Sequence, residues 1–585
     1  MIASRRLLLA CILFAALPTI STAQARRAQS ACAQITAACR DAGFVPGAAK
    51  SGNGLQVDCI QPILQGTAAP RRASKPLPKI DPQVIAACKA QNPQFGKATP
   101  NDAGTVQLAP APAPVLVSHP AAPGSPNIVF ILTDDLSMNL VQFMPHVLAM
   151  ERSGVTFDHY FVTDSLCCPS RSSIFTGRYP HDTGVFKNVG DDGGYLVFKA
   201  RGNEQATFAV ALAAAGYRTA FMGKYLNGYE PAQHPAGPGW SHWMVAGNGY
   251  PEFRYALNND GQLVRHGLQP QDYLTDVLAA DAVRFIQQKA DQPFFIEVAT
   301  FAPHAPYTPA PRDANAFQGL HAPRTAAYNA AHDAAAPRWL VSTPALTQAD
   351  MDSIDHDFRK RAQSVLAVDK MIGELQAAVS AAGQAQNTYF VFSSDNGYHM
   401  GEYRLMPGKM TAYDTDIHVP LVVTGPGVPS GRTVGAIVEN VDLCPTFEEL
   451  AGSAGQLPNV DGASLVPLLH KNAAAGWRAA ALVEHHGPVR DLIDPDMPIA
   501  RSGNPTTYEA IRSLAWLYVE YADGGREFHD LATDPDELHN TFSSISASQK
   551  ATLHKMLTDT TNCHSAKECW TAQGGTSASP GTGAQ

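Results

Sequence analysis

The chain has 585 residues, of which 45% are hydrophobic and 16% charged, so it is long enough for a large core and several domains. Its formal net charge of −9 at pH 7 argues against a nucleic-acid-binding protein, which would need a basic surface. The 43 Lys and Arg residues and 20 histidines still allow a local cationic pocket.

The N-terminus has the features of a secretory signal. Arg5 and Arg6 precede an apolar run from Leu7 to Leu17, and small-residue cleavage sites follow near residues 23–25. We therefore predict a signal peptide over 1–25 and a secreted or periplasmic mature protein. No later stretch reaches the roughly 20 apolar residues that a spanning helix needs, so no membrane span is expected.

The next segment, 26–97, is small, loop-rich and contains several cysteines. It carries four of them, namely Cys32, Cys39, Cys59 and Cys88, and we expect two disulfides whose pairing is not readable from the sequence. A Pro/Ala-rich linker follows over 98–124. Of the ten cysteines, the signal peptide removes Cys11 and leaves nine, and an odd count in a secreted chain indicates one thiol with another fate.

The rest of the chain alternates apolar runs with helical patterns. This alternation predicts an α/β catalytic domain over 125–475 with a large mixed, mostly parallel sheet flanked by helices. A smaller C-terminal α/β subdomain with an antiparallel sheet is expected over 476–570, where 508–531 is interpreted as two strands around an Asp-Gly-Gly turn. Cys563 and Cys569 are close enough in sequence to form a disulfide, and a disordered tail is expected over 571–585.

Polar side chains follow four of the predicted strands. The strands are 127–135, 217–225, 293–304 and 388–397, and the polar residues at their ends are Asp134, Asp135, Lys224, His304, Asp395 and Asn396. Because ligands bind at the carboxyl ends of parallel strands, we expect these side chains to form one site. A helix over 358–379, whose apolar residues recur at helical spacing, is interpreted as core packing alone.

One short motif carries a specific resemblance. Cys167-x-Pro169-Ser170-Arg171, followed by Thr176-Gly177, resembles the signature of the type I sulfatases of the alkaline phosphatase superfamily. "PHAPY" (303–307) and "SDNGYHMGEYRLMPGK" (394–409) follow in the order of that family. "GKYLNGY" (223–229) and "FRKRAQSVLAVDKMI" (358–372) are most similar to the glucosamine-6-sulfatase and extracellular endosulfatase branch. The resemblance covers about residues 125–570.

The resemblance implies an alkaline-phosphatase-like sandwich and an exported sulfatase, a sulfuric ester hydrolase. Its partner would be a small-molecule or oligosaccharide sulfate ester, such as a sulfated sugar, cleaved to alcohol and sulfate. A formylglycine-generating enzyme would convert Cys167 to Cα-formylglycine (3-oxoalanine), which leaves an even number of cysteines. A hydrated aldehyde offers one hydroxyl to attack sulfur and a second to expel sulfate afterwards.

The same resemblance implies the roles of individual residues. The ligands of one Ca²⁺ ion, with Mg²⁺ as the alternative, would be Asp134, Asp135, Cys167 in its modified form, Asp395 and Asn396. The catalytic and sulfate-binding residues would be Arg171 on the aldehyde hydrate, Lys224 and Lys409 on the sulfate oxygens, and His304 as the acid for the leaving alcohol. His181 would support the hydrate, because Leu226 stands where many sulfatases have a second histidine.

Two alternative functions also fit the sequence. A formylglycine-dependent phosphonate monoester or phosphodiester hydrolase has the same fold, and paired assays on an aryl sulfate and an aryl phosphonate separate the two. A non-catalytic carbohydrate-binding relative would never mature its cysteine, which the mass of the intact protein decides. The residues alone do not identify the physiological ester; the resemblance to the branch implies a sulfated sugar such as a 6-O-sulfated glucosamine unit.

Overall fold

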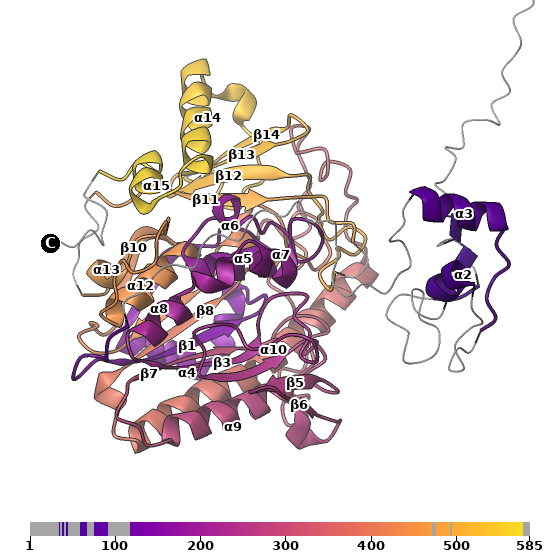
Figure 1. The fold of residues 1–585 in the computed structure, drawn as a ribbon. Coiled ribbons are helices and arrows are strands. Elements are labelled where there is room, and N and C mark those ends of the chain that lie inside the picture. Colours follow the sequence, from indigo (N-terminus) through magenta and orange to yellow (C-terminus); the bar gives the residue numbers. More distant parts are fainter. Residues whose placement is uncertain are drawn as a thin grey trace, which may run out of the picture. The chain divides into compact units, whose positions relative to one another are not determined.

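The chain forms two compact units, Met1–Val106 and Gln107–Gln585 (Figure 1). The computed structural model describes residues 34–35, 38–39, 42–44, 59–66, 75–91, 118–470, 476–491 and 494–576. The predicted signal peptide over 1–25 and most of the predicted linker over 98–124 lie outside these described residues.

The first unit is small and held by disulfides. It contains the helices α2 (Gln61–Gln65) and α3 (Pro82–Gln91). Cys39 is bonded to Cys59, and Cys88 is also in a disulfide; Cys32 lies outside the described residues. A short list of buried side chains makes its core: Ile35, Phe44, Ile60, Ile63 and Leu64.

The second unit is built on a ten-stranded sheet with the order β10-β2-β9-β8-β1-β7-β3-β4-β5-β6. Its strands are β1 (Asn127–Thr133), β2 (Val155–Phe161), β3 (Arg218–Lys224), β4 (His242–Ala246), β5 (Ala256–Asn259), β6 (Gln262–Arg265), β7 (Phe294–Ala299), β8 (Thr388–Ser394), β9 (Leu421–Thr424) and β10 (Arg432–Glu439). The central strands pair in parallel, whereas β9, β5 and β6 run antiparallel to their neighbours. The predicted mixed, mostly parallel sheet is therefore confirmed.

Helices cover both faces of this sheet. They are α4 (Pro145–Ser153), α5 (Cys167–Thr176), α7 (Gly194–Ala200), α8 (Phe208–Ala214), α9 (Leu274–Gln287), α10 (Gln348–Ala381), α11 (Asp414–Ile417), α12 (Leu443–Leu450) and α13 (Val466–His470). Side chains of β1 alternate between two cores: Val129 packs with residues of α4, α9 and α10, and Phe130 packs with residues of α5, α8 and α12. Figure 1 shows α9 and α10 on one side of the sheet and α5 and α8 on the other. A sheet buried on both faces explains why β1 is apolar throughout.

The four strands predicted to carry polar ends are all present and adjacent. They are β8, β1, β7 and β3, which lie side by side at the centre of the sheet. Their carboxyl ends therefore meet at one edge, as the sequence analysis expected. The predicted apolar face of α10, from Phe358 to Val379, is buried in the core under the sheet.

The C-terminal part forms a second, antiparallel sheet with the order β11-β12-β13-β14. Its elements are β11 (Ala480–His485), β12 (Tyr508–Ser513), β13 (Trp516–Tyr521), β14 (Arg526–Asp530), α14 (Ala547–Thr561) and α15 (Ala566–Ala572). The prediction of two strands over 508–531 was wrong, because the segment holds three. A tight turn after Ser513, whose hydroxyl accepts hydrogen bonds from the N–H groups of Ala515 and Trp516, separates β12 from β13.

The end of the described chain is anchored to this part. Cys563 and Cys569 form the expected disulfide, with an S–S distance of 1.99 Å. The prediction of a disordered tail over 571–585 was wrong for its first residues. Gln573 donates hydrogen bonds to Tyr179 and Glu439, and the N–H of Thr576 donates to the carbonyl of Gly476. Residues 577–585 lie outside the described residues.

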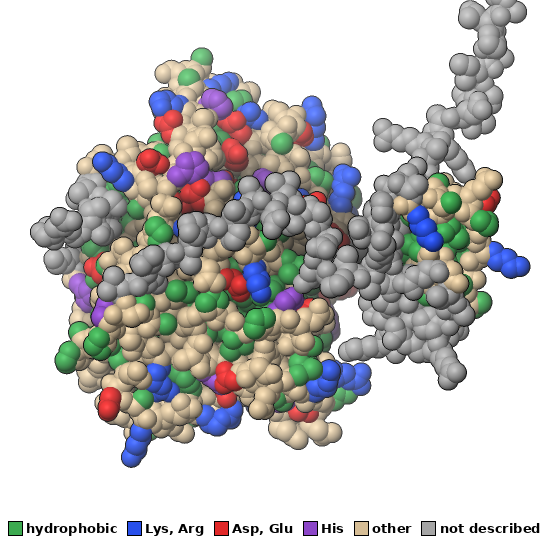
Figure 2. Space-filling view, in the orientation of Figure 1, with side chains coloured by type: hydrophobic (Ala, Val, Ile, Leu, Met, Phe, Trp, Pro, Cys, Tyr) green, Lys and Arg blue, Asp and Glu red, His purple; other side chains and the backbone are tan. Residues whose placement is uncertain are grey.

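One face of the molecule shows polar side chains of mixed charge (Figure 2). On the face drawn in Figure 2, acidic, basic and histidine side chains lie close together over the region of α14, and hydrophobic side chains are scattered. Across the portion of the chain that the structure describes, no helix is both long enough and apolar enough to span a bilayer.

Candidate active site

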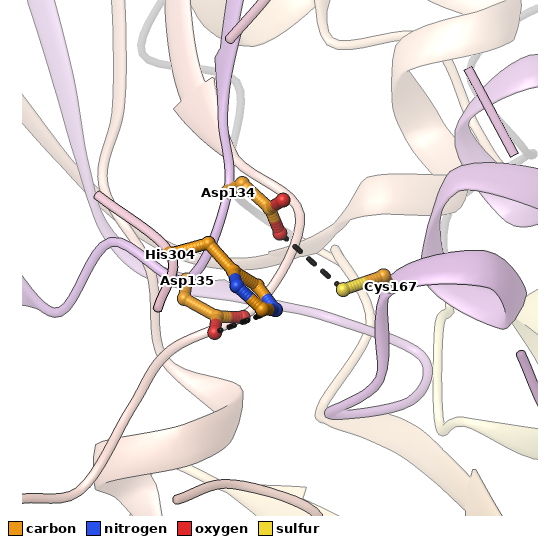
Figure 3. Close-up of side chains that lie close together, drawn as sticks. All are labelled: Asp134, Asp135, Cys167 and His304. Carbon is orange, nitrogen blue, oxygen red and sulfur yellow. Dashed lines mark hydrogen bonds and ion pairs between the residues drawn. The ribbon is translucent and has the colours of Figure 1, made fainter. Parts of the chain in front are cut away.

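Cys167 lies at the centre of a cluster of charged side chains at the carboxyl edge of the large sheet (Figure 3). It is the first residue of α5, and its thiol is fully buried. The Sγ atom lies 3.3 Å from Asp134 Oδ1 and 2.9 Å from Lys409 Nζ. Figure 3 shows Asp134 and Asp135, which follow β1, and His304, which lies in the loop after β7, close to one another and to Cys167.

The residues of the cysteine motif hold α5 in this position. Arg171 Nε donates to Asp395 Oδ2 at 2.8 Å, and the hydroxyl of Ser170 donates to the carbonyl of Asp395. Gly177 ends the helix with a φ of 69°, and a Cβ there would lie 2.8 Å from Val460 Cγ1. The motif thus fixes the start of α5 against the strand end that carries Asp395.

Asp134 and Asp135 follow directly after β1. Burial raises the pKa of Asp134 to about 6, against the opposing effect of Lys224. Asp135 has a φ of 63°, and its carbonyl accepts a hydrogen bond from Arg361 Nη2 at 2.5 Å. Arg361 is fully buried on α10, so the helix that the sequence analysis treated as core packing alone also supports the site.

Asp395 and Asn396 follow β8 and adjoin the two aspartates. Asp395 Oδ1 accepts from the backbone N–H groups of Asp135 and Asn396 at 3.1 and 2.8 Å. Although burial opposes its ionisation, Arg171 and the two lysines lower the pKa of Asp395 to about 2. Asn396 Nδ2 donates to Asp135 Oδ1 at 2.7 Å.

Two buried lysines supply positive charge. Lys224, the last residue of β3, forms an ion pair with Asp134, and Lys409 Nζ lies 2.6 Å from Asp135 Oδ1. Burial lowers the pKa of each ammonium group, but the neighbouring aspartates outweigh it and hold both pKa values well above the usual range. Both lysines therefore carry a full charge that an anionic ligand can use.

His304 lies in the loop after β7. Its Nδ1 lies 2.7 Å from the carbonyl of Ala305, and its Nε2 lies 2.5 Å from Asp496 Oδ1 and 3.6 Å from Asp135 Oδ2. Burial lowers the pKa of the ring, but Asp135 and Asp496 raise it above its ordinary value overall. With an acceptor beside each nitrogen, the ring is suited to the doubly protonated form that can give up a proton.

The thiol of Cys167 is poorly suited to act as a nucleophile itself. Burial, followed by the charges of Asp134 and Asp496, holds its pKa well above the ordinary value. A thiol that stays protonated is a weak nucleophile, because the thiolate is the reactive form. The surroundings therefore do not activate sulfur at this position.

Asp496 also belongs to the cluster, although the sequence does not predict it. It belongs to the segment after β11, and its side chain is 3% exposed. It contacts His304 and Lys409, as well as the thiol of Cys167 at 3.4 Å. Its only signal in the sequence is the acid-rich stretch that ends at Asp496, and such stretches are usually solvated surface turns.

The structure does not bring His181 into this cluster. His181 lies on α6 (Pro180–Thr183), where Nδ1 is 2.8 Å from Glu484 Oε2 and Nε2 is 2.8 Å from the carbonyl of Cys563. Both ring nitrogens thus face the C-terminal part. These contacts link α6 to β11 and to the disulfide loop at Cys563, so the position of His181 indicates a structural role.

His181→Gln is accordingly expected to lower stability more than catalysis. Although burial opposes the charge, Glu484 raises the pKa of His181 to about 9. Because this is above the pKa of a free histidine, about 6.5, the ion pair stabilises the fold fully below pH 6.5 and the contribution is lost as pH rises through 9.

Thermal unfolding of His181→Gln at pH 6 should therefore show a midpoint about 2 °C below the wild type, with a smaller difference at pH 9.5. The value of kcat should stay within about threefold of the wild type. A large loss of kcat with an unchanged melting temperature would instead support the catalytic role expected from the sequence.

The donor set at the cluster fits a metal ion. Ligand atoms of Asp134, Asp135, Cys167 and His304 all lie within 4.8 Å of one another and are buried. Asn396 Oδ1 is buried and has no hydrogen-bond partner among the described residues, so an acceptor stands without a donor beside the two aspartates. Carboxylate and amide oxygens are the ligands that hard divalent cations prefer.

The fold and the cluster define a hydrolase of anionic esters. A buried residue at a helix start, paired acids suited to a cation, two charged lysines and a histidine with an acceptor beside each ring nitrogen meet at the carboxyl edge of a doubly covered sheet. The model of the Sulfatase family matches residues 126–453, and that of the C-terminal region of N-sulphoglucosamine sulphohydrolase matches 401–563. The chain belongs to the sulfatase family and is a sulfuric ester hydrolase.

Named relatives place it within the family. It is 35% identical over 453 residues to human N-acetylglucosamine-6-sulfatase, which covers 72% of this chain and 81% of that protein. It is 34% identical over 383 residues to the extracellular sulfatase SULF-1 homolog of Drosophila melanogaster, with 63% of this chain and 34% of that protein covered. The predicted similarity to this branch is confirmed.

The solved structures agree on the fold. The structure of BT4656 in complex with its substrate D-glucosamine-2-N,6-O-disulfate superposes with a TM-score of 0.61 at 23% identity. The match covers 74% of this chain and 97% of that chain. The predicted alkaline-phosphatase-like architecture is thereby confirmed.

Proposed function

We propose that the protein is a secreted, calcium-dependent sulfatase that removes sulfate from a sulfated sugar through a formylglycine at position 167. The observation that carries the proposal is the setting of Cys167: burial holds the pKa of its thiol well above the ordinary value, yet the thiol lies where lysines, acids and a histidine converge. Such machinery is useful only if the side chain becomes a different nucleophile. The sulfatase motif around Cys167 supports an aldehyde hydrate as that nucleophile.

Conversion of the cysteine replaces CH₂SH with CHO, which removes sulfur and two hydrogens and adds one oxygen. The reaction is an oxidation, so it needs the formylglycine-generating enzyme and an external oxidant before the protein is active. The hydrated aldehyde supplies one hydroxyl for attack on sulfur and a second for release of sulfate.

The chain's own residues then perform the remaining tasks. Lys224 and Lys409 bind the non-bridging sulfate oxygens and stabilise the charge that grows on them. Arg171 is fixed by Asp395, and its Nη2 is buried without a partner among the described residues, so it offers a donor to the side chain at position 167. His304 gives its Nε2 proton to the departing alcohol.

The residues proposed to hold the cation are Asp134, Asp135, Asp395, Asn396 and the modified residue 167. When bound, Ca²⁺ would act as a Lewis acid toward the nucleophile and offset the charge of the sulfate. We propose calcium rather than magnesium, because metal sites of extracytoplasmic proteins that combine carboxylate and amide oxygens usually favour Ca²⁺.

A sugar sulfate is the proposed substrate class. The human relative is named for N-acetylglucosamine 6-sulfate, and a neighbouring structure holds a disulfated glucosamine. We therefore propose a 6-O-sulfated glucosamine unit as the substrate of this chain. Sulfate release from such a sugar, with no phosphonate release from an aryl phosphonate, supports the proposal; efficient phosphonate hydrolysis with little sulfatase activity would contradict it.

The acid role of His304 is testable by the leaving group. His304→Gln should reduce kcat for a sugar sulfate by about 100- to 1,000-fold, because a sugar alkoxide is a poor leaving group that needs a proton. Para-nitrophenyl sulfate, whose leaving group departs as a stable anion, should lose less than about tenfold. Equal losses on both substrates would exclude His304 as the general acid.

A further inference from the structure

The carboxylate of Asp496 lies inside the cluster of charged side chains around Cys167, between the nucleophile position and the general acid. Oδ1 contacts His304 Nε2 at 2.5 Å and Lys409 Nζ at 3.0 Å. Oδ2 contacts Cys167 Sγ at 3.4 Å and accepts a hydrogen bond from Asn188 Nδ2 at 2.6 Å. The carboxylate therefore bridges the two groups that act on opposite sides of the reacting sulfur.

This position is the one that a sulfate ester needs. Sulfur must lie within reach of the nucleophile at position 167 and its leaving oxygen within reach of His304, with the lysines beside the other oxygens. A carboxylate and a sulfuryl group are both anions and cannot share this space. Binding of the ester thus requires Asp496 to give up its contacts with His304 and Lys409.

The displaced carboxylate keeps its charge and needs new partners. A buried anion without hydrogen-bond donors is costly, so the exchange is favourable only if donors replace the two cations. A 6-O-sulfated glucosamine offers hydroxyl donors on its ring, the nearest of them at C4, and an amino group farther away at C2. A simple aryl sulfate or free inorganic sulfate offers no such donors.

The segment that carries Asp496 is placed to move with it. Asn188 holds the carboxylate from one side, and the N–H of Asp496 donates to Asp494 Oδ1 at 2.9 Å. Beyond Asp496 the segment faces solvent, since Met497 and Ile499 are 37% and 59% exposed. Packing of these two side chains therefore does not oppose a small outward shift of residues 496–500 toward a bound sugar.

We propose that Asp496 is a specificity-determining residue. Its carboxylate occupies the position of the sulfate group and so weakens the binding of free anions and aryl sulfates. A sulfated sugar displaces it, because hydroxyl or amino groups of the sugar then donate hydrogen bonds to the displaced carboxylate. The proposal rests on the proposed function of the same site. It adds to that function the feature of the substrate that the site selects, namely hydrogen-bond donors on the sugar.

Asp496→Ala and Asp496→Asn, prepared as full-length mature enzyme, test the proposal. Both should bind inorganic sulfate about tenfold more tightly in isothermal titration calorimetry, which needs no turnover. The ratio of kcat/KM for 6-O-sulfated glucosamine to that for para-nitrophenyl sulfate should fall about 10- to 100-fold. Asp523→Asn removes an equal charge from the exposed turn between β13 and β14 and should change neither quantity.

The outcomes separate this proposal from the proposed function. If the wild type binds sulfate but hydrolyses no sulfate ester, the proposed function fails, while the calorimetric comparison still tests whether Asp496 competes for the pocket. Tighter sulfate binding with an unchanged substrate ratio would show a competing anion without a selective role and would overturn the proposal. Unchanged sulfate binding would overturn it too, since displacement would then not occur.

Discussion

Replacing Cys167 with serine is expected to lower the steady-state rate of sulfate release at least about 1,000-fold while leaving the fold intact. A serine hydroxyl can attack sulfur, but once sulfated it has no second hydroxyl with which to expel the group. The variant should therefore complete at most one turnover and gain about 80 Da, the mass of one sulfuryl group.

The neighbouring Cys168 offers a matched control. Its side chain is also buried and it occupies the variable position of the motif, but the group that contacts Asn188 is its backbone N–H and not its sulfur. Cys168→Ser should keep kcat within about threefold of the wild type. Repeated turnovers by Cys167→Ser, measured as more than one sulfate released per protein molecule, would contradict the formylglycine mechanism.

Removal of divalent cations is expected to abolish activity nearly completely, to below about 1% of the starting rate. Without the cation, the charge of the sulfate is offset less, because the neighbouring lysines and Arg171 are already paired with the buried acids Asp134, Asp135 and Asp395. Added Ca²⁺ should restore the rate after treatment with a chelator, and Mg²⁺ should restore less.

The ligand variants refine this test. Asn396→Ala removes the orphaned carbonyl oxygen and should raise the calcium concentration needed for half-maximal activity by about 10- to 100-fold. Circular dichroism should show that the chelated protein remains folded. Full activity in excess chelator would remove the metal from the account.

Much of the site could be predicted because it follows from the sheet. Strands that read as uninterrupted apolar runs are buried on both faces, and the polar residue after each one must lie at the carboxyl edge. Asp134, Lys224, His304 and Asp395 are far apart in sequence but follow adjacent strands. Their convergence is thus a consequence of parallel pairing, and the cysteine motif identified the chemistry.

The residues that were missed or misplaced lie where no such rule operates. Asp496 reaches the site from an irregular segment after β11, and no periodicity fixes the path of such a segment. Arg361 lies on α10, where the apolar residues recur at helical spacing, and that pattern gives no sign that Arg361 is also buried and contacts the site. His181 was assigned from the motif's neighbourhood, yet α6 turns it toward Glu484, a partner more than 300 residues later.

The most direct test of the account is the mass of the mature protein purified from its native host. Conversion of the side chain at position 167 to an aldehyde lowers the mass by about 18 Da relative to the encoded sequence, and a peptide map should place that loss at this residue. The account predicts this loss in active preparations. Fully active protein with an unmodified thiol at position 167 in every molecule would contradict it.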